Sequence, residues 1–469
     1  MRRRSLLVLS VLLVASVLAV GTSSAQSDEP DWFVVEEQLP FDAVEGFEDS
    51  TREWGVWRGA GYRYEIPADW NGDLVMWAHG FRGDGPELTV DNPPFREYLL
   101  EQGYAWGASS YDRNDYDVLS GAVSTKILAS YMMRRVLPER PEHIYLAGAS
   151  MGGHITGYSM ERYRWLYDGA MPVCGVMGDY ELFDIFLDFN VAAQQLGTGS
   201  SAFPVDPIVY VTETVPAIKA SLELGEGTWP LALNDTGTGF RQLVENITGG
   251  DRPNFDEAFA FWNTIPDNGS GPGNFLFDLG LGDGSLPNSG GRSVVDNTDT
   301  VYQLDLDPAI SPEEQALNDG IVRTAQDAGA RRTEAITGKI SDPVLTMHNL
   351  GDLFVPYAMQ IDYAEDVASF GREHLLVQRA IRGSGHCDFT VAEYEQGFAD
   401  LVRWVEDGVR PEGDVVLDPA AVAAADYGCR WTDPAPDAHF FAAPCPSDDP
   451  PGDDDGLDDE AGEEPSTGD

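Results

Sequence analysis

Short, almost wholly apolar runs recur along the chain and alternate with stretches of helical spacing. The runs 74–78, 104–109 and 143–147 are shorter than typical helices, and their continuous hydrophobicity is typical of strands buried on both faces. Further strands are expected at 61–66, 169–174, 344–347 and 375–380. Helices are expected where apolar residues recur on one face, at 120–136, 153–163 and 391–405. This alternation predicts an α/β fold with a mostly parallel sheet flanked by helices.

A long segment interrupts the alternation between two of the expected core strands. Residues 178–338 contain many Gly, Asn and Pro residues together with numerous aromatic side chains. We interpret this insertion as a large cap, or lid, domain over the strand ends. Most of its aromatic residues are expected to form the core of the cap. Some should face the cleft, because ligand pockets are usually lined by aromatic groups, and we select Phe186 and Trp262 as candidate substrate-binding residues.

The remaining parts of the chain follow from this division. The core is expected in two sections, 26–177 and 339–410, separated by the cap. A C-terminal extension, 411–446, precedes a tail at 447–469 that is rich in Asp, Glu, Gly and Pro and has few apolar residues. Such a tail cannot bury enough apolar surface to fold, so we expect it to be disordered. Its Asp run is not interpreted as a calcium site, because no flanking helices are expected.

The N-terminus has the three parts of a secretory signal. Arg2-Arg3-Arg4 is followed by an apolar run at 6–20 and by the small residues Ser23-Ser24-Ala25. The apolar run is short for a membrane-spanning helix, although an uncleaved anchor remains the alternative. We therefore predict a signal peptide at 1–25, a secreted, extracellular product, and no membrane association after cleavage.

Acidic residues dominate the charge of this 469-residue chain. It has 79 Asp and Glu against 29 Lys and Arg, a formal net charge of −50. Nucleic acid is excluded as a partner, because its phosphates would be repelled. The charge is explained either by a well-solvated surface or by a saline habitat, in which ions screen the repulsion. Nothing in the sequence indicates an oligomeric state.

Ser150 is the candidate nucleophile. It lies in Gly148-Ala149-Ser150-Met151-Gly152, between the expected strand at 143–147 and the expected helix at 153–163. A serine at the tip of a tight strand-to-helix turn needs small neighbours, because the backbone there is strained. The first amide groups of the helix then point toward negative charge that develops at the serine.

A serine becomes a good nucleophile only when an oriented base takes its proton. His386 is the candidate base, because it lies in the Gly-rich loop Gly383-Ser384-Gly385-His386 after the last expected strand. Asp352 is the candidate acid, because it follows the strand at 344–347 and lies between Ser150 and His386 in the chain. Asp352 would hold one ring nitrogen of His386 and leave the other to accept the proton of Ser150.

An oxyanion hole is the third requirement of this chemistry. We expect its donors to be the backbone N–H groups of Phe81 and Met151. Phe81 follows the strand at 74–78 and the small residue Gly80, and Met151 directly follows Ser150. His79 is interpreted as a structural residue beneath this loop.

Four cysteines follow the signal segment. In an exported chain they are expected to form disulfides. Cys429 and Cys445 are close together in a Pro-rich segment, which predicts a local loop and leaves Cys174 to pair with Cys387. The alternative is that Cys174 is a buried thiol.

Together these motifs resemble the α/β-hydrolase superfamily. The resemblance covers about 60–177 and 341–407 and rests on His79-Gly80, the Ser150 turn, Gly351-Asp352 and Gly385-His386. The family's chain order of Ser, Asp and His is kept. The resemblance implies the α/β-hydrolase fold and is not specific for a substrate.

Gly385-His386-Cys387 is also similar to tannases and feruloyl esterases. In those enzymes a cysteine beside the nucleophile is joined to one beside the base. Here the residue before Ser150 is Ala149, so any such bond must use Cys174. This departure puts tannase or feruloyl esterase activity in doubt, but not a general esterase role.

These observations predict a secreted serine hydrolase that cleaves carboxylic esters through an acyl-enzyme on Ser150. The substrate is expected to be a small-molecule or polymeric ester, and no cofactor or metal is expected. A serine peptidase of the capped, aminopeptidase-like type is the alternative, since an acidic cap would attract a peptide's amine. A binding protein without catalysis would not need Ser150, Asp352 and His386 together.

Overall fold

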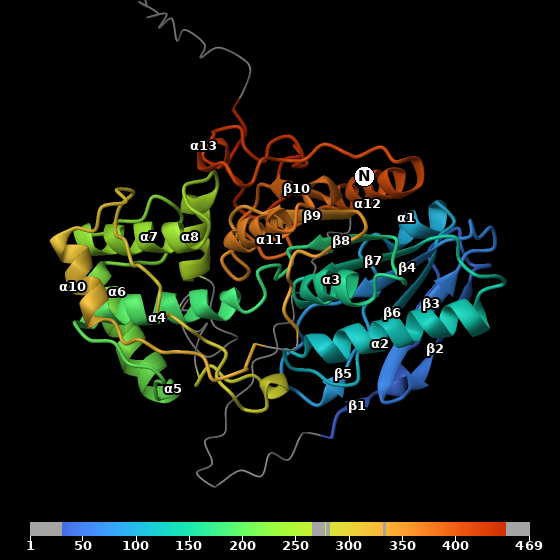
Figure 1. Ribbon diagram of the computed structural model, residues 1–469, viewed down its shortest axis with the longest axis horizontal. Helices are drawn as coiled ribbons and strands as arrows, with labels where there is room; N and C mark the ends of the chain where they lie inside the picture. Colours follow the sequence, from blue (N-terminus) through green and yellow to red (C-terminus); the bar gives the residue numbers. More distant parts are fainter. Residues whose placement is uncertain (1–30, 265–276, 278–281, 332–333, 447–469) are drawn as a thin grey trace, which may run out of the picture.

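The computed structural model describes residues 31–264, 277, 282–331 and 334–446. At its centre is an eight-stranded sheet with the strand order β10-β9-β8-β7-β4-β6-β3-β2 (Figure 1). In chain order the strands are β2 (Thr51–Trp57), β3 (Ala60–Ile66), β4 (Leu74–Ala78), β6 (Ala105–Ser109), β7 (Ile144–Ala149), β8 (Gly169–Val173), β9 (Val344–Asn349) and β10 (Leu376–Ile381). β3 pairs antiparallel with β2 and β6, and the other pairs are parallel. The predicted mostly parallel sheet is thereby confirmed.

Two apolar layers hold helices on the two faces of the sheet. Along β4, Leu74, Met76 and Ala78 enter one layer, while Val75 and Trp77 enter the other, as the alternation of side chains along a strand requires. The first layer is covered by α2 (Val118–Tyr131), α3 (Met151–Arg162) and α11 (Ala358–Ser369). The second is covered by α1 (Arg96–Glu101) and α12 (Val391–Asp407). The fold is therefore a doubly covered α/β sandwich of the α/β-hydrolase type.

The N-terminal edge of the sheet contains a strand that the apolar pattern did not predict. β2 pairs along its whole length with β3, from Thr51 opposite Ile66 to Trp57 opposite Ala60. Trp54 and Trp57 are 41% and 40% exposed. Because β2 lies at the edge and has the charged residues Arg52 and Glu53 before these rings, it lacks the continuous hydrophobicity of the central strands. A separate parallel pair joins β1 (Phe33–Val34) to β5 (Glu87–Leu88).

The insertion between β8 and β9 is mainly helical. The α-helices among its described residues are α4 (Glu181–Thr198), α5 (Pro207–Val209), α6 (Val215–Leu222), α7 (Asp235–Ile247), α8 (Phe255–Thr264) and α10 (Pro312–Gly320). They lie beside the sheet, at the left of Figure 1. Phe189, Phe240 and Phe259 are fully buried in a cluster of their own. Leu353 and Val355 belong to the same cluster, so the insertion packs onto the loop that follows β9.

Shorter helical turns complete the described elements. They are η1 (Glu36–Gln38), η2 (Met132–Val136), η3 (Tyr210–Thr214), η4 (Pro287–Ser289), η5 (Glu373–Leu375) and α13 (Pro419–Val422). The predicted signal peptide at 1–25 and the acidic tail at 447–469 lie outside the described residues. None of the helices within the described ranges has the length and apolar character that crossing a bilayer requires.

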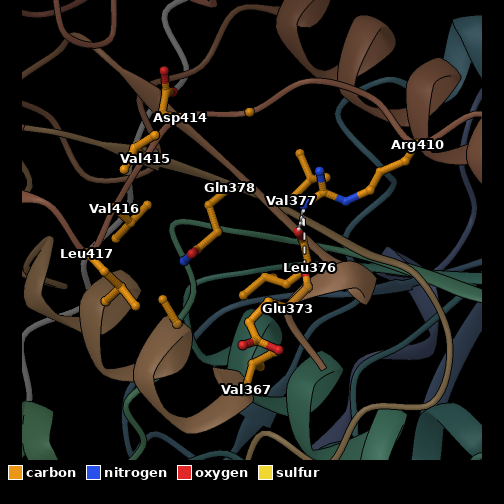
Figure 2. A pocket seen from close by; sticks show the side chains of 12 residues that line it. Val367, Glu373, Leu376, Val377, Gln378, Arg410, Asp414, Val415, Val416 and Leu417 are labelled. Carbon is orange, nitrogen blue, oxygen red and sulfur yellow. Dashed lines mark hydrogen bonds between the residues drawn. The ribbon is translucent and has the colours of Figure 1, made fainter. Parts of the chain in front are cut away.

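The C-terminal extension runs along the exposed edge of β10. The N–H of Ala380 donates to the carboxylate of Asp414 at 2.7 Å, and the N–H of Asp414 donates to the carbonyl of Gln378 at 2.8 Å. A pocket of about 370 Å³ lies between this extension, α11 and the first residues of β10 (Figure 2). The guanidinium of Arg410 crosses it to the carbonyl of Leu376 at 2.6 Å. The pocket is therefore at the amino end of β10, whereas His386 follows the carboxyl end.

Candidate active site

Ser150 is the single residue between β7, which ends at Ala149, and α3, which begins at Met151. Its backbone has φ 60° and ψ −124°, a conformation that a residue with a side chain rarely adopts. Strain of this kind is characteristic of functional sites, and here it holds the serine at the tip of the turn. The carbonyl of Ser150 accepts a hydrogen bond of 2.8 Å from the N–H of Gly153, which closes the turn.

Neighbouring glycines make the turn possible. A Cβ at Gly152 would lie 2.1 Å from the carbonyl oxygen of Ala78, and one at Gly148 would lie 2.3 Å from the carbonyl oxygen of Gly152. Any side chain at either position would clash with backbone. The small residues expected around the nucleophile are thus required by the close packing of α3 against β4 and β7.

The three predicted catalytic side chains form one hydrogen-bonded chain. The Nε2 atom of His386 lies 2.8 Å from Oγ of Ser150, and its Nδ1 atom lies 2.5 Å from Oδ2 of Asp352. Asp352 is fully buried, whereas the side chain of His386 is 17% exposed. The acid is therefore shielded from water, while the base and the half-buried serine remain within reach of a substrate.

The loop after β9 fixes the second oxygen of the acid. Oδ1 of Asp352 accepts hydrogen bonds of 2.9 Å from the N–H groups of Phe354 and Val355. Oδ2 is left for His386. Gly351 must lack a side chain, because a Cβ there would lie 2.7 Å from the carbonyl oxygen of Gly383 in the loop of the base. The loops of the acid and the base are thus packed directly against each other.

A disulfide ties the loop of the base to the strand beside the nucleophile. Cys174, directly after β8, is bonded to Cys387, with Cα atoms 5.2 Å apart. The N–H of Cys174 also donates to the carbonyl of Met347 in β9 at 2.8 Å. The pairing matches the sequence prediction, and it restrains the residue that follows His386. The second disulfide joins Cys429 to Cys445, also as predicted.

The sequence did not predict that the C-terminal extension would hold the loop of the base. We call residues 429–445, closed by their disulfide, the C-terminal loop. The N–H and Oγ of Ser384 donate to the carbonyls of Phe440 and Phe441, at 2.8 Å and 3.1 Å. In return, the N–H of Phe440 donates to Oδ2 of Asp388 at 2.6 Å. No periodic pattern signals such contacts, because both partners are irregular loops.

Asn254, from the insertion, joins the same network. Its side-chain amide donates to Oγ of Ser384 at 2.8 Å, and its side-chain oxygen accepts from the N–H of Ala443. One buried side chain therefore connects the insertion, the loop of the base and the C-terminal loop.

The loop after β4 lies against the nucleophile. A Cβ placed on Gly80 would lie 3.0 Å from Cβ and 3.4 Å from Oγ of Ser150. The backbone of the residue that precedes Phe81 is thus close to the serine. Met151 is the first residue of α3, so its N–H belongs to the helix turn that lacks intrahelical acceptors. Both placements suit the two expected oxyanion donors, whose role stays a prediction.

His79 lies beneath this loop as a buried residue. Its Nδ1 atom is 2.7 Å from the carbonyl oxygen of Gly80, and its ring stacks on Tyr111 with centroids 4.1 Å apart. Burial, with a smaller contribution from the charge of Arg82, lowers the pKa of His79 to about 3. A neutral, packed imidazole fits the structural role that the sequence suggested.

Phe186 and Trp262, the candidate substrate residues, are only 7% and 4% exposed. Both rings pack beside Phe354, with centroid distances of 6.2 Å and 6.4 Å. Phe354 in turn meets the ring of His386 edge-on at 5.0 Å. The two insertion residues are therefore connected to His386, the candidate base, through Phe354. The sequence offered one signal that Phe354 belongs to the site, because Phe354 follows the candidate acid Asp352 by two positions.

Two groups within the described residues place three ligand-type side chains close enough for a metal ion. In Cys174, His386 and Cys387, both sulfurs are bonded to each other and are not thiolates. In Asp73, His143 and Glu406, the side chains lie near the starts of β4 and β7, away from Ser150. Neither group places a metal ligand set at the candidate site.

Comparison with known proteins gives distant similarities. No family model matches the chain. A stretch of 76 residues, 16% of this chain, is 26% identical to an o-phthalyl amidase of Xanthobacter agilis and spans 17% of that protein. The chain thus aligns with less than a fifth of this relative's length.

Solved structures align over more of the chain. A feruloyl esterase B from Aspergillus oryzae is 14% identical, with a TM-score of 0.44, and the alignment covers 76% of this chain and 80% of that one. A tannin acyl hydrolase from Aspergillus niger is 16% identical, with a TM-score of 0.39, over 80% and 87% of the two chains. At these identities the likeness concerns the fold alone.

Proposed function

We propose that this chain, whose fold is that of the α/β-hydrolases, hydrolyses carboxylic esters through an acyl-enzyme on Ser150. One observation carries the proposal. Ser150 Oγ, the imidazole of His386 and the buried carboxylate of Asp352 lie in an unbroken chain of hydrogen bonds, 2.8 Å and 2.5 Å long. This is the arrangement in which a base activates a serine and an acid orients the base.

In the proposed reaction, Nε2 of His386 takes the proton of Ser150 while Oγ bonds to the carbonyl carbon of the ester. The negative oxygen that results is stabilised by the N–H groups of Phe81 and Met151. Collapse of this intermediate expels the alcohol, which receives the proton from His386. Water then attacks the acyl-enzyme by the same steps, and the carboxylic acid leaves.

Asp352 supports these steps without changing its own protonation. Its Oδ1 atom is occupied by two backbone N–H groups, so Oδ2 is free to hold Nδ1–H of His386. This contact selects the tautomer whose Nε2 faces Ser150, and it stabilises the imidazolium that forms during the reaction.

The insertion at 178–338 is proposed to act as the cap that discriminates between substrates. Its helices form their own apolar core and pack onto the loop of the acid. The proposal also includes export after removal of residues 1–25. The two disulfides support this, because such bonds persist mainly in oxidising compartments.

Amide hydrolysis is the second candidate, and it uses the same three residues. The observation in its favour is the 76-residue similarity to an amidase. A peptide or simple amide would then replace the ester, with the amine as leaving group.

The test combines labelling with a substrate panel. A fluorophosphonate probe should form an adduct on Ser150, located by peptide mass mapping, and Ser150→Ala should lose both the adduct and hydrolysis while remaining folded. p-Nitrophenyl esters should be turned over faster than aminoacyl p-nitroanilides. A Ser150→Ala variant that retains activity within about tenfold of the parent contradicts the proposal. Faster hydrolysis of the anilides than of the esters would favour amide hydrolysis, the second candidate, over ester hydrolysis.

A further inference from the structure

Two adjacent phenyl rings on the C-terminal loop are exposed to solvent. Phe440 is 61% exposed and Phe441 is 52% exposed. Large apolar groups that remain together at a surface are typical of binding sites. The backbone of this pair is fixed, because the carbonyls of both residues accept hydrogen bonds from Ser384.

The pair lies next to the proposed catalytic base. A Cβ placed on Gly385, the residue before His386, would lie 3.1 Å from Cδ2 of Phe440. Phe440 therefore packs against the loop from which His386 extends. The exposed ring of Phe440 thus lies against Gly385, which directly precedes His386 in the chain.

On the other side, the pair meets the insertion. Phe261 of α8 stacks on Phe440 with centroids 6.3 Å apart and contacts Phe441 at 5.5 Å. From Phe261 the rings continue through Trp262 at 5.4 Å to Phe354, which touches His386. The ring contacts thus run from the imidazole through Phe354 and the buried Trp262 to Phe261, which lies beside the exposed rings of the C-terminal loop.

Charged groups near the pair are already engaged. Asp388 accepts from the N–H of Phe440, and Glu393 is paired with the buried ring of His439 at 2.9 Å. The guanidinium of Arg382, which donates to the carbonyls of Ala443 and Pro444 in the C-terminal loop, is itself buried and therefore also engaged. A neutral, apolar ligand suits this environment best.

We propose that Phe261, Phe440 and Phe441 form an apolar subsite for the substrate, binding an aryl or longer alkyl group on the acyl side of the ester. The inference rests on the proposed hydrolysis at Ser150 and assigns substrate contacts to the C-terminal loop in addition to the insertion. Because this subsite lies beyond the reacting bond, it contributes to KM for large esters and leaves acetate esters unaffected.

The test compares a small and a large substrate on the full chain. Phe441→Ala and the double variant Phe440→Ala with Phe441→Ala are assayed with p-nitrophenyl acetate and p-nitrophenyl benzoate. We expect KM for the benzoate to rise at least about tenfold, the effect of losing one buried phenyl contact, with kcat/KM for the acetate within about twofold. Phe441→Leu should recover most of the loss.

The matched control is Trp165→Ala. Trp165 is 65% exposed and precedes β8, at the edge of the parallel sheet opposite to Ser150. The Trp165→Ala variant should leave kcat and KM unchanged for both esters. Equal losses for acetate and benzoate in the Phe441→Ala variant would assign these residues to positioning His386 and overturn the subsite.

Two further outcomes would overturn the subsite. Unchanged kinetics for both esters is one, and a dimer that dissociates in the double variant during sedimentation is the other, because the rings would then bind a second copy. Failure of the underlying function is seen separately, as an absence of Ser150 labelling and of any ester turnover in the parent protein.

Discussion

The indole N–H of Trp262 donates a hydrogen bond of 2.9 Å to the carbonyl oxygen of Gly351, the residue before Asp352. Helix α8 of the insertion is therefore hydrogen-bonded to the loop that carries the proposed acid. A displacement of α8 would therefore also displace the backbone next to Asp352.

This link predicts the effect of Trp262→Phe. The variant keeps the ring and loses the hydrogen bond, which is worth about 1 kcal/mol, or roughly fivefold in rate if expressed fully in the transition state. We expect kcat to fall by about this factor for small and large esters alike, with KM unchanged. Trp229→Phe, elsewhere in the insertion, is the control. A change in the ranking of acyl chain lengths would instead place Trp262 in contact with substrate.

Asp352→Asn tests the orientation of the base. An amide fits the same space, but its NH₂ group can donate to Nδ1 and favours the wrong tautomer of His386. We expect kcat to fall about 10⁴-fold while the melting temperature changes little. Steady-state kinetics and thermal unfolding measure the two effects. A loss smaller than about tenfold would mean that another group orients His386.

Removing the disulfide at the base should affect both stability and rate. Cys174 and Cys387 are 213 positions apart, so their bond restrains a long segment of the unfolded chain. We expect the double variant Cys174→Ala with Cys387→Ala to lose about 2–5 kcal/mol in the free energy of unfolding, measured by urea titration.

The folded double variant should also show a lower kcat, because Cys387 directly follows the base. Cys429→Ala with Cys445→Ala opens the C-terminal loop, which contacts the loop of the base through hydrogen bonds, such as those to Ser384, and not through a covalent bond, so it should lower kcat less. Should the Cys174 and Cys387 variant turn over substrate at the parental rate, the disulfide would have no role in holding His386.

The raised pKa of Asp362 predicts how the free energy of unfolding depends on pH. Burial, together with the charges of Glu181, Glu365, Asp366 and Asp179, raises the pKa of Asp362 to about 7. Between about pH 4 and pH 7 the native state therefore holds a proton that the unfolded state has lost. The free energy of unfolding should fall as the pH rises through this window.

Asp362→Asn should remove that contribution. The variant is expected to be more stable than the parent at pH 8 and similar to it near pH 4, as measured by urea titration at each pH. Asp407→Asn, at an exposed carboxylate at the end of α12, is the control, because Asp407 is not among the charges that raise the pKa of Asp362. A variant less stable than its parent at pH 8 would show that ionised Asp362 makes a favourable contact.

The central strands and the nucleophile turn were predictable because each obeys a short-range rule. The run at 74–78 is buried on both faces, so hydrophobicity alone identifies β4. Around Ser150, packing against backbone demands glycine, and glycine is visible in the sequence. Asp352 and His386 follow from the same logic, because each lies in a loop that follows a strand at the same edge of a parallel sheet.

Other features depend on contacts that no local pattern encodes. Ser384 meets Phe440 through two irregular loops, and Asn254 reaches both from the insertion. The burial of Phe186 and Trp262 was equally hidden, since an aromatic residue in an insertion packs inward or faces a cleft without a change in sequence. The edge strand β2 was missed because solvent on one side removes its apolar signature.

The bond between Cys174 and Cys387 encloses the whole insertion and the proposed acid within one covalent ring. A single protease cut at any point between these cysteines leaves two pieces that stay attached. The nicked chain would migrate as one species without reductant and as two with it. A cut within the insertion therefore leaves the segment that carries the proposed base covalently attached to the segment that carries the proposed nucleophile.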